Sequence, residues 1–171
     1  MPITRLNHAV LYVRDVNTSV AFYSDVLGFR KLDMLPDGFE GAAFLQAEGS
    51  ANDHDLGLFQ IGSDAKPSTA GRSTVGLYHL AWEVDTLVEL ARLQQTLAES
   101  GSLTGTTDHS TSKSLYGTDP DGMEFEVAWF VPGHKLDDEV LERRKGISRL
   151  DLEAERERYG SGTVGGLAGT P

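Results

Sequence analysis

The chain has 171 residues, 39% of them hydrophobic, which is enough to bury the core of one ordinary domain or of two halves. Its formal net charge of -11 makes nucleic acid an unsuitable partner, because a field of that sign repels phosphate backbones. The absence of cysteine excludes disulfides, thiolate metal sites and cysteine nucleophiles, and fits a cytoplasmic location. No apolar run approaches the roughly 20 residues of a membrane span, and the first residues lack a signal-peptide pattern, so we expect no membrane partner.

The first half of the chain predicts one strand, one helix and three further strands. Residues 7–13 are rich in β-branched and aromatic side chains, which favour a strand. Asp15 or Asn17 can cap the helix that follows, and turn signals containing glycine separate the later strands. The predicted elements are, in order, a strand at 7–13, a helix at 18–27 that ends at Gly28, and strands at 29–35, 41–48 and 54–61.

The same order of elements returns after a linker at residues 62–74 that is rich in small and polar residues. Leucines at helical spacing predict the second helix. The segment Leu6-Asn7-His8-Ala9 also aligns with Leu77-Tyr78-His79-Leu80, which indicates a diverged internal duplication. We therefore predict an α+β fold of two tandem βαβββ modules, whose two sheets can face each other across a shared cleft. The second set consists of a strand at 76–84, a helix at 86–99, and strands at about 104–109, 113–118 and 123–131.

The duplicated part is predicted to form one domain at residues 1–133, with modules at about 4–62 and 75–131. A tail at 134–171 follows. Residues 137–159 carry dense charge of both signs and predict helix, whereas the glycine-rich stretch from Gly160 onward predicts a mobile end. The tail can cover an edge of the sheet or contact a partner subunit, and the residues do not choose between the two.

Strand alternation places three side chains of metal-ligand type on one side of the predicted sheets. Successive residues of a strand point to opposite faces, and apolar residues take every second position in the first, fifth and last strands. If these apolar faces pack under the helices, His8, His79 and Glu126 point to the concave side. Two imidazoles and a carboxylate suit a divalent first-row metal and leave positions for substrate and dioxygen. The alternative is two ordinary half-buried histidines and a solvated glutamate.

Three segments carry a resemblance to a known superfamily: LNHAV at 6–10, FYSDVLGF at 22–29 and YGTDPDGMEFE at 116–126. With them, residues 4–131 resemble the vicinal oxygen chelate superfamily, which includes glyoxalase I, extradiol dioxygenases, and fosfomycin- and bleomycin-resistance proteins. The resemblance implies the glyoxalase-like fold, a curved mixed sheet around a metal cleft, and assigns metal binding to His8, His79 and Glu126. The sequence DPDG also fits a type I turn that leads into the strand of Glu126.

Single-domain catechol 2,3-dioxygenase-like members are the nearest match within the superfamily. The segment NDHDLGLF at 52–59 is similar to the part of extradiol dioxygenases that carries an acid–base histidine, here His54. His109 and Tyr116 resemble the family residues that contact a substrate oxygen. The resemblance thus implies Fe(II), with Mn(II), Zn(II) or Ni(II) as alternatives, a small aromatic catechol substrate with O2, and a homo-oligomer, a dimer. Each of the three residues also has an interpretation without a catalytic role. His54 can be a polar residue at a strand start, His109 a loop histidine, and Tyr116 a packed tyrosine.

Other activities of the superfamily stay open. Glyoxalase I-like members use a fourth ligand on the fourth strand, where we predict that Leu56 and Leu58 point inward, and Gln60 is available only if the register shifts. Fosfomycin-type lyases or transferases need cations for a phosphonate, for which Lys113 and Arg72 are available. A non-enzymatic binding protein, as in bleomycin sequestration, would lack the metal ligands, so the presence of all three argues against it.

Overall fold

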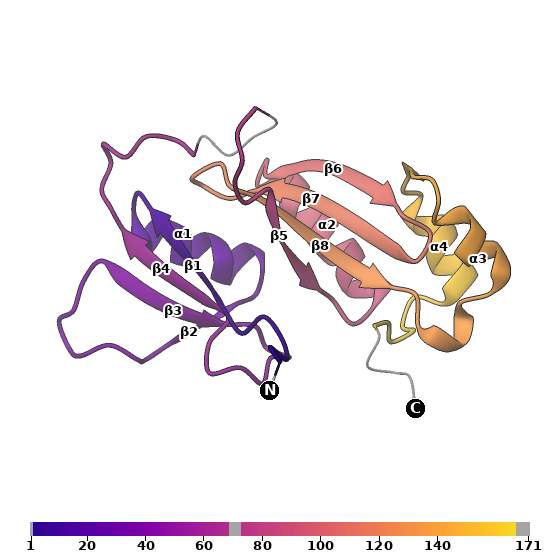
Figure 1. Ribbon diagram of the computed structural model, residues 1–171, viewed down its shortest axis with the longest axis horizontal. Helices are drawn as coiled ribbons and strands as arrows, with labels where there is room; N and C mark the ends of the chain where they lie inside the picture. Colours follow the sequence, from indigo (N-terminus) through magenta and orange to yellow (C-terminus); the bar gives the residue numbers. More distant parts are fainter. Residues whose placement is uncertain (1, 69–72, 167–171) are drawn as a thin grey trace. The chain divides into compact units, whose positions relative to one another are not determined.

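The computed structural model describes residues 2–68 and 73–166 of the chain (Figure 1). These residues form two compact units, each built around one sheet. The first unit holds residues 2–68 together with the turn Asp119–Gly122, and the second unit holds residues 73–118 and 123–166. The two repeats predicted from the sequence therefore correspond to two separate cores.

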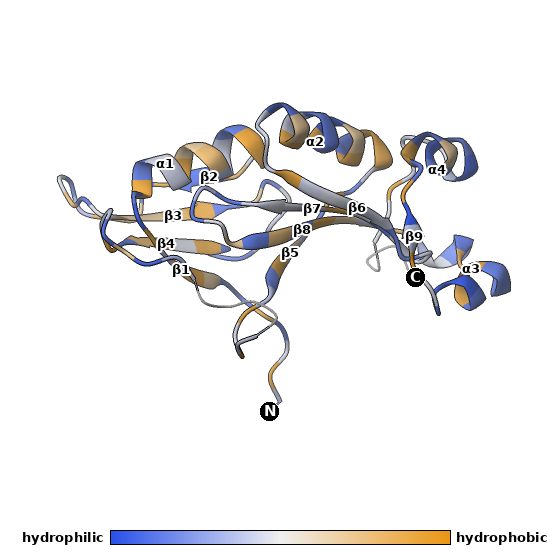
Figure 2. Ribbon diagram, turned by 90° about the horizontal axis from the view of Figure 1, so that it is seen from above, coloured by the Kyte–Doolittle hydropathy of each residue, from blue (hydrophilic) through white to orange (hydrophobic). Residues whose placement is uncertain are grey.

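The first unit contains a four-stranded sheet in the order β1-β4-β3-β2, in which β1 and β4 are parallel and the other pairs are antiparallel. The helix α1 lies over one face of this sheet (Figure 2). Four leucines on that face are at most 5% exposed: Leu11, Leu45, Leu56 and Leu58. Burial of each leucine side chain stabilises the folded state by about 1.5–3 kcal/mol. The elements are β1 (Ala9–Val13), α1 (Val16–Ala21), η1 (Phe22–Val26), β2 (Arg30–Leu32), β3 (Ala42–Gln46) and β4 (Leu56–Gln60).

Local side chains set the bounds of α1. Asp15 is the cap, because its Oδ1 accepts the N–H of Thr18 at 2.7 Å. The last turn widens into the π-helical η1. Gly28 follows with a φ of 79°, a left-handed conformation that glycine adopts without strain. The predicted helix is confirmed as α1 and η1 together, and it begins two residues earlier than expected.

The turn at 119–122 closes with a hydrogen bond of 2.9 Å from its fourth N–H to its first carbonyl, as the DPDG sequence predicts. Asp121 accepts the backbone N–H of Arg14 at 3.1 Å and its guanidinium at 2.7 Å. The buried Tyr23 hydroxyl donates to Asp119 Oδ2 at 3.1 Å. Burial and the charge of Asp119 raise the pKa of Tyr23, so the phenol stays protonated and keeps this bond.

The second unit repeats the same strand order in a five-stranded sheet, β5-β8-β7-β6-β9, with β5 and β8 parallel. Since its first four strands take the places of β1, β4, β3 and β2, the duplicated βαβββ pattern is confirmed. The leucines of α2, which lies over one face (Figure 2), are at most 3% exposed. The elements are β5 (His79–Glu83), α2 (Leu87–Glu99), β6 (Leu103–Asp108), β7 (Ser112–Thr118), β8 (Glu124–Phe130), η2 (Gly133–Lys135), α3 (Asp138–Arg143), β9 (Ser148–Arg149) and α4 (Leu152–Tyr159).

The predicted helical character of the charged C-terminal segment is confirmed, and the helix is divided in two. It forms the two short helices α3 and α4, and the strand β9 between them pairs with β6 at Thr107 and Asp108. The segment thus covers an edge of the sheet, one of the two roles expected for it. The reason is long-range: an exposed edge strand offers free backbone N–H and C=O groups that β9 can pair with.

Residues 160–166, the first part of the stretch predicted to be mobile, make hydrogen bonds to the rest of the second unit. The carbonyl of Thr163 accepts the indole N–H of Trp129 at 3.2 Å, and Gly165 N donates to Asp85 O at 2.8 Å. A Cβ at Gly165 would lie 2.4 Å from Phe130 O, so only glycine fits at this contact. The remaining predicted mobile residues, 167–171, and part of the predicted linker, 69–72, lie outside the described residues.

The architecture confirms the predicted α+β class. Two mixed sheets, of four and five strands, carry the helices α1 and α2, and the C-terminal helices α3 and α4 complete the second unit. None of the helices in the described ranges has the length and apolar character that crossing a membrane requires.

Gly117 provides a test of the packing beside the candidate site. A Cβ at this position would lie 2.5 Å from Cζ of Phe125 and 3.0 Å from Ser102 O, so Gly117→Ala should lower the free energy of unfolding by about 1–3 kcal/mol. Gly105→Ala is the matched control on the neighbouring strand, because no atom lies within 4 Å of its added Cβ. Urea unfolding measures both; equal stability of the two variants would contradict the described packing of Phe125.

Candidate functional site

Two of the predicted metal ligands lie side by side in the second unit. His79 begins β5, Glu126 lies in β8, and the parallel register places Ala81 opposite Glu126. Residues two apart in a strand share a face, so both side chains lie on the face opposite α2. His79 Nε2 is 3.1 Å from Glu126 Oε2, and the side chains are 24% and 15% exposed.

The separation of these two atoms fits two ligands of one metal ion. Donors at about 2.1 Å from a metal and at right angles to each other lie about 3 Å apart. His79 Nδ1 is buried without a hydrogen-bond partner, so the imidazole is turned toward Glu126 through its Nε2 alone. Within the described part of the chain, no three His, Asp or Glu side chains are gathered in a metal-binding group. The second unit therefore brings together two of the three predicted ligands, and His8 belongs to the first unit.

Tyr116 and His109 lie beside the His79–Glu126 pair. Tyr116 of β7 stands opposite Glu126 in the antiparallel register, and its ring centre is 6.0 Å from that of His79. His109, in the turn after β6, places its Nε2 2.9 Å from the Tyr116 hydroxyl. Burial and then the charge of Glu126 raise the pKa of Tyr116 to about 12, so the phenol is neutral near pH 7 and can donate a hydrogen bond. The four polar side chains form one continuous group.

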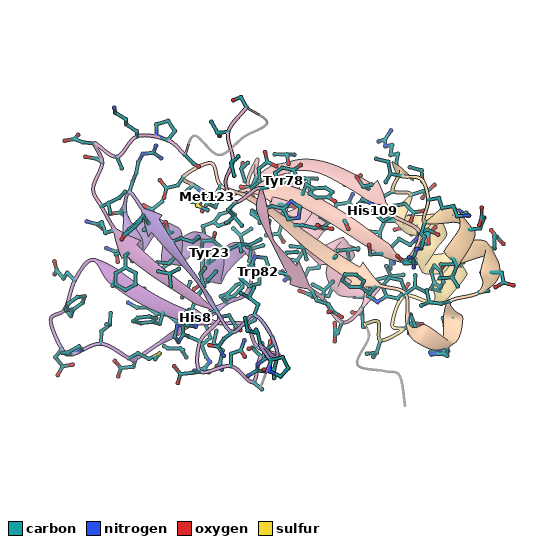
Figure 3. The ribbon with its side chains drawn as sticks, viewed as in Figure 1. His8, Tyr23, Tyr78, Trp82, His109 and Met123 are labelled. Atoms are coloured by element: carbon teal, nitrogen blue, oxygen red, sulfur yellow. The ribbon has the colours of Figure 1, made fainter. Side chains whose placement is uncertain are left out.

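His8 and His54 come together in the first unit. His8 directly precedes β1 (Figure 3), His54 precedes β4, and their ring centres are 4.3 Å apart. The ring of Phe44 lies 4.9 Å from that of His54. Gly57 leaves space for it, because a Cβ there would already touch Phe44 at 3.4 Å. The open face of this sheet thus presents two imidazoles beside an aromatic surface.

The residue before each of these histidines was not predicted to have a role. Asn7 Oδ1 lies 2.8 Å from His8 Nδ1, and Asp53 Oδ2 lies 3.0 Å from His54 Nδ1. An ionised carboxylate only accepts hydrogen bonds, so the neutral His54 carries its proton on Nδ1 and its lone pair on Nε2. The signal was present in the sequence, since Asn-His and Asp-His are adjacent pairs.

The predicted orientation of β4 is wrong by one residue. Leu56 and Leu58 are fully buried on the α1 side, and Gly57 and Phe59 take the open face instead. Gln60 is also directed to the helix, where its Oε1 accepts the N–H of Val16 at 3.0 Å. The expectation that β4 supplies no fourth metal ligand remains, but for a different reason: its open positions carry glycine and phenylalanine.

Of the two cations considered for a phosphonate, the structure describes Lys113, and its charge is not available to an anion. Lys113 is 0% exposed and is paired with Asp108 at 2.5 Å and Glu155 at 2.9 Å. It also pairs in register with Trp129, on the sheet face opposite Tyr116 and Glu126. Arg72 lies outside the described residues.

Comparison with known proteins covers most of the chain. The family model described as the Glyoxalase/Bleomycin resistance protein/Dioxygenase superfamily matches residues 5–127. A catechol-2,3-dioxygenase of Bacillus subtilis (strain 168) is 32% identical over 124 residues, which are 72% of this chain and 41% of that protein. The chain thus spans less than half the length of this relative.

Solved structures share the fold. The glyoxylase/bleomycin resistance protein/dioxygenase domain from Frankia sp. EAN1pec matches 78% of this chain and 96% of its own, with a TM-score of 0.62 and 22% identity. The genomically encoded fosfomycin resistance protein of Listeria monocytogenes matches 84% of this chain and 99% of its own, with a TM-score of 0.55 and 18% identity. At these identities the likeness concerns the fold alone.

The hydrogen bond between Gln60 and the first residue of α1 predicts the effect of replacing Gln60 on metal uptake and on stability. Gln60→Ala should leave the uptake of a divalent metal ion unchanged and lower the free energy of unfolding by about 0.5–1 kcal/mol, since one hydrogen bond to Val16 is lost. Metal analysis by plasma emission and thermal unfolding measure the two effects, with the exposed Gln95→Ala as control. A loss of metal in Gln60→Ala would make this residue a ligand and contradict its described orientation.

Proposed function

The chain belongs to the glyoxalase/bleomycin resistance protein/dioxygenase superfamily, and from this premise we propose that it is an extradiol dioxygenase that cleaves a catechol-type ring with Fe(II) and O2. The observation that carries the proposal is the contact of His109 with Tyr116 at 2.9 Å, directly beside the His79–Glu126 pair. A neutral phenol and an imidazole next to two proposed metal ligands can hold a diol oxygen and move its proton.

The proposed ligands of the metal are His8, His79 and Glu126. Two histidines and one carboxylate with open positions are the ligand set of non-haem Fe(II) oxygenases; Mn(II), Zn(II) and Ni(II) are the alternatives. When bound, Fe(II) supplies positions for the two diol oxygens and for O2, and lets electrons pass between them. The 3.1 Å separation of His79 and Glu126 supports their part in the set. His8 is proposed because it holds the place in the first repeat that His79 holds in the second.

The protein side chains have separate tasks in the proposed reaction. Tyr116 donates its hydroxyl hydrogen to one substrate oxygen, and His109 Nε2 fixes the direction of that phenol. His54 takes up the proton of the substrate hydroxyl through its free Nε2, since its Nδ1–H is directed to Asp53. O2 is the oxidant: the ring C–C bond next to the diol breaks, and both oxygen atoms remain in a muconic semialdehyde-type product.

The alternatives in the same superfamily are a glyoxalase- or fosfomycin-resistance-type lyase or transferase and a non-enzymatic binding protein. The open positions of β4, Gly57 and Phe59, offer no fourth ligand of the glyoxalase type. Lys113 is buried in ion pairs and does not offer a charge for a phosphonate. The name of the Bacillus subtilis relative also favours catechol cleavage. The expected dimer and the cytoplasmic location stay predictions.

Anaerobic loading with Fe(II), followed by catechol and O2, tests the proposed reaction. We expect a yellow ring-cleavage product and one O2 consumed per catechol, measured by absorbance and an oxygen electrode. The same preparation serves as its own control with fosfomycin or methylglyoxal and a thiol. The proposal is wrong if a panel of substituted catechols is left unchanged while either thiol reaction proceeds.

Substitution of single histidines separates metal binding from proton transfer. His79→Ala should remove bound Fe(II), whereas His54→Ala should retain it and lower kcat by about 10²–10⁴-fold, the usual contribution of an acid–base group. His134→Ala is the control, because His134 is an exposed residue of η2. Metal content and turnover are measured on the same samples. If His54→Ala also lost the metal, this residue would be a ligand rather than an acid–base group.

A further inference from the structure

The turn between β6 and β7, which carries His109, has a strained backbone. Ser110 has a φ of 68°, the one positive value at a non-glycine residue in the described ranges. L-residues with a Cβ avoid this conformation, so it persists only where surrounding contacts hold it. The turn itself adds two backbone bonds, His109 N to Ser112 O at 3.0 Å and Thr111 N to His109 O at 2.9 Å.

Two contacts hold Ser110 in this conformation. Its N–H donates to Asp108 Oδ1 at 2.7 Å, and its hydroxyl donates to the carbonyl of Val140 in α3 at 2.8 Å. Both Ser110 and Val140 are buried, at 3% and 0% exposure. The conformation of the turn therefore depends on a helix that lies 30 residues later in the chain.

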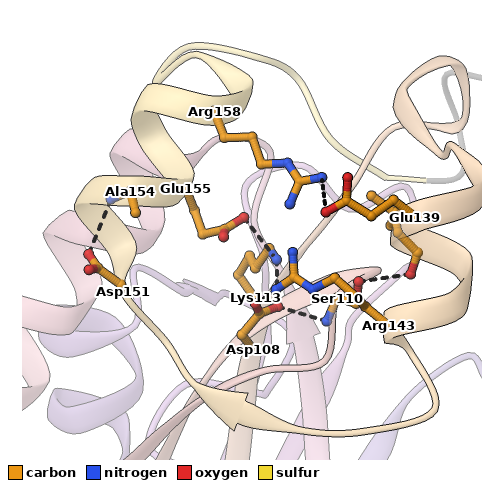
Figure 4. A network of polar contacts seen from close by, with 10 residues as sticks. Asp108, Ser110, Lys113, Glu139, Arg143, Asp151, Ala154, Glu155 and Arg158 are labelled. Carbon is orange, nitrogen blue, oxygen red and sulfur yellow. Dashed lines mark hydrogen bonds and ion pairs between the residues drawn. The ribbon is translucent and has the colours of Figure 1, made fainter.

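Asp108 is in turn fixed by two cations (Figure 4). Lys113 Nζ lies 2.5 Å from its Oδ1, and Arg143 Nη2 lies 3.1 Å from its Oδ2. Lys113 is held from the other side by Glu155 of α4 at 2.9 Å. Burial by itself raises the pKa of Asp108, but the bonds from Lys113 and Ser110 and the two positive charges outweigh burial and lower it. The carboxylate thus stays charged and keeps all its donors.

This buried group of charges has little value as a source of stability. Removing charges from water costs about as much as their attraction returns, so apolar residues of the same size would serve the fold equally well. The charges instead fix the positions of the side chains that they join, because hydrogen bonds to a carboxylate are specific in geometry. The group lies at the base of the turn whose first residue, His109, contacts Tyr116.

We propose that the C-terminal segment, residues 137–159, positions His109: Glu155, through Lys113 and Asp108, and Val140, through Ser110, hold the turn that presents His109 Nε2 to the Tyr116 hydroxyl. Asp108, Ser110, Lys113 and Glu155 are positioning residues, since they act through His109. The catalytic purpose of the contact rests on the proposed function, but the dependence of the contact on the segment does not.

Nuclear magnetic resonance of the metal-free full chain, labelled at histidine and tyrosine, reads out the contact directly. The measured signal is the nuclear Overhauser effect between the rings of His109 and Tyr116. Glu155→Gln removes the charge that faces Lys113 while keeping the shape of the side chain. Glu153→Gln is the matched control in the same helix, because that side chain is 77% exposed.

We expect Glu155→Gln to lose the Overhauser effect and Glu153→Gln to retain it. In the Fe(II)-loaded protein, kcat should fall about tenfold in Glu155→Gln, with KM for the catechol nearly unchanged, because a displaced acid–base contact slows the reaction rather than binding. In a His109→Ala background, the same substitution should have no further effect on kcat.

Two substitutions of Ser110 test the proposal even if Glu155→Gln does not fold. Ser110→Ala loses the bond to Val140 but keeps the strain, so the turn should relax and the Overhauser effect should disappear. Ser110→Gly should retain it, since glycine adopts a φ of 68° without help from α3. A signal of wild-type strength in Ser110→Ala, or in a folded Glu155→Gln, overturns the proposal. If the signal is lost while the wild type cleaves no catechol, the positioning stands and the proposed function fails.

Discussion

The register of β8 between β5 and β7 is the constraint on which the candidate site depends. Glu126 stands opposite Ala81 on one neighbour and Tyr116 on the other. A slip of one residue would turn Glu126 toward α2 and bring an apolar side chain to the open face. Phe125 and Val127 prevent this, because each is only 2% exposed and would lose its burial in the slipped sheet. Hydrophobic packing on one face thus determines the chemistry that the other face can hold.

In the first unit, the residue before each histidine accepts a hydrogen bond from the imidazole and so selects its tautomer. A free imidazole exchanges its proton between two nitrogens, and either tautomer can be present. Beside Asp53, the Nδ1 of His54 is held at hydrogen-bond distance from a carboxylate, which leaves Nε2 as the basic atom. The same arrangement at His8, with Asn7 as the acceptor, leaves Nε2 as the nitrogen that carries the lone pair. The adjacent polar residue selects the reactive nitrogen in both cases.

The C-terminal segment connects fold and site within the second unit. Its strand β9 covers the free edge of β6. Its helices bring Arg143 and Glu155 to the buried Lys113–Asp108 pair, and His109 directly follows Asp108 in the chain. The positive charge of the buried Lys113 offsets the charges of the two carboxylates that it contacts, Asp108 and Glu155. The segment is therefore part of the second unit rather than an appendage to it.

The sequence by itself determined the repeat, the helix positions and the faces of β1, β5 and β8, because alternation and helical spacing are local patterns that burial enforces. The face of β4, the place of Lys113 and the path of the C-terminal segment were decided only by the tertiary structure. In β4 the apolar residues Leu56, Leu58 and Phe59 occupy both faces of the strand, so the sequence pattern does not indicate which face is buried. Lys113 pairs with Glu155, which lies 42 residues later, and Thr107 and Asp108 of β6 pair with Arg149 and Ser148, which lie 42 and 40 residues later. Contacts at such separations leave no local pattern in the sequence.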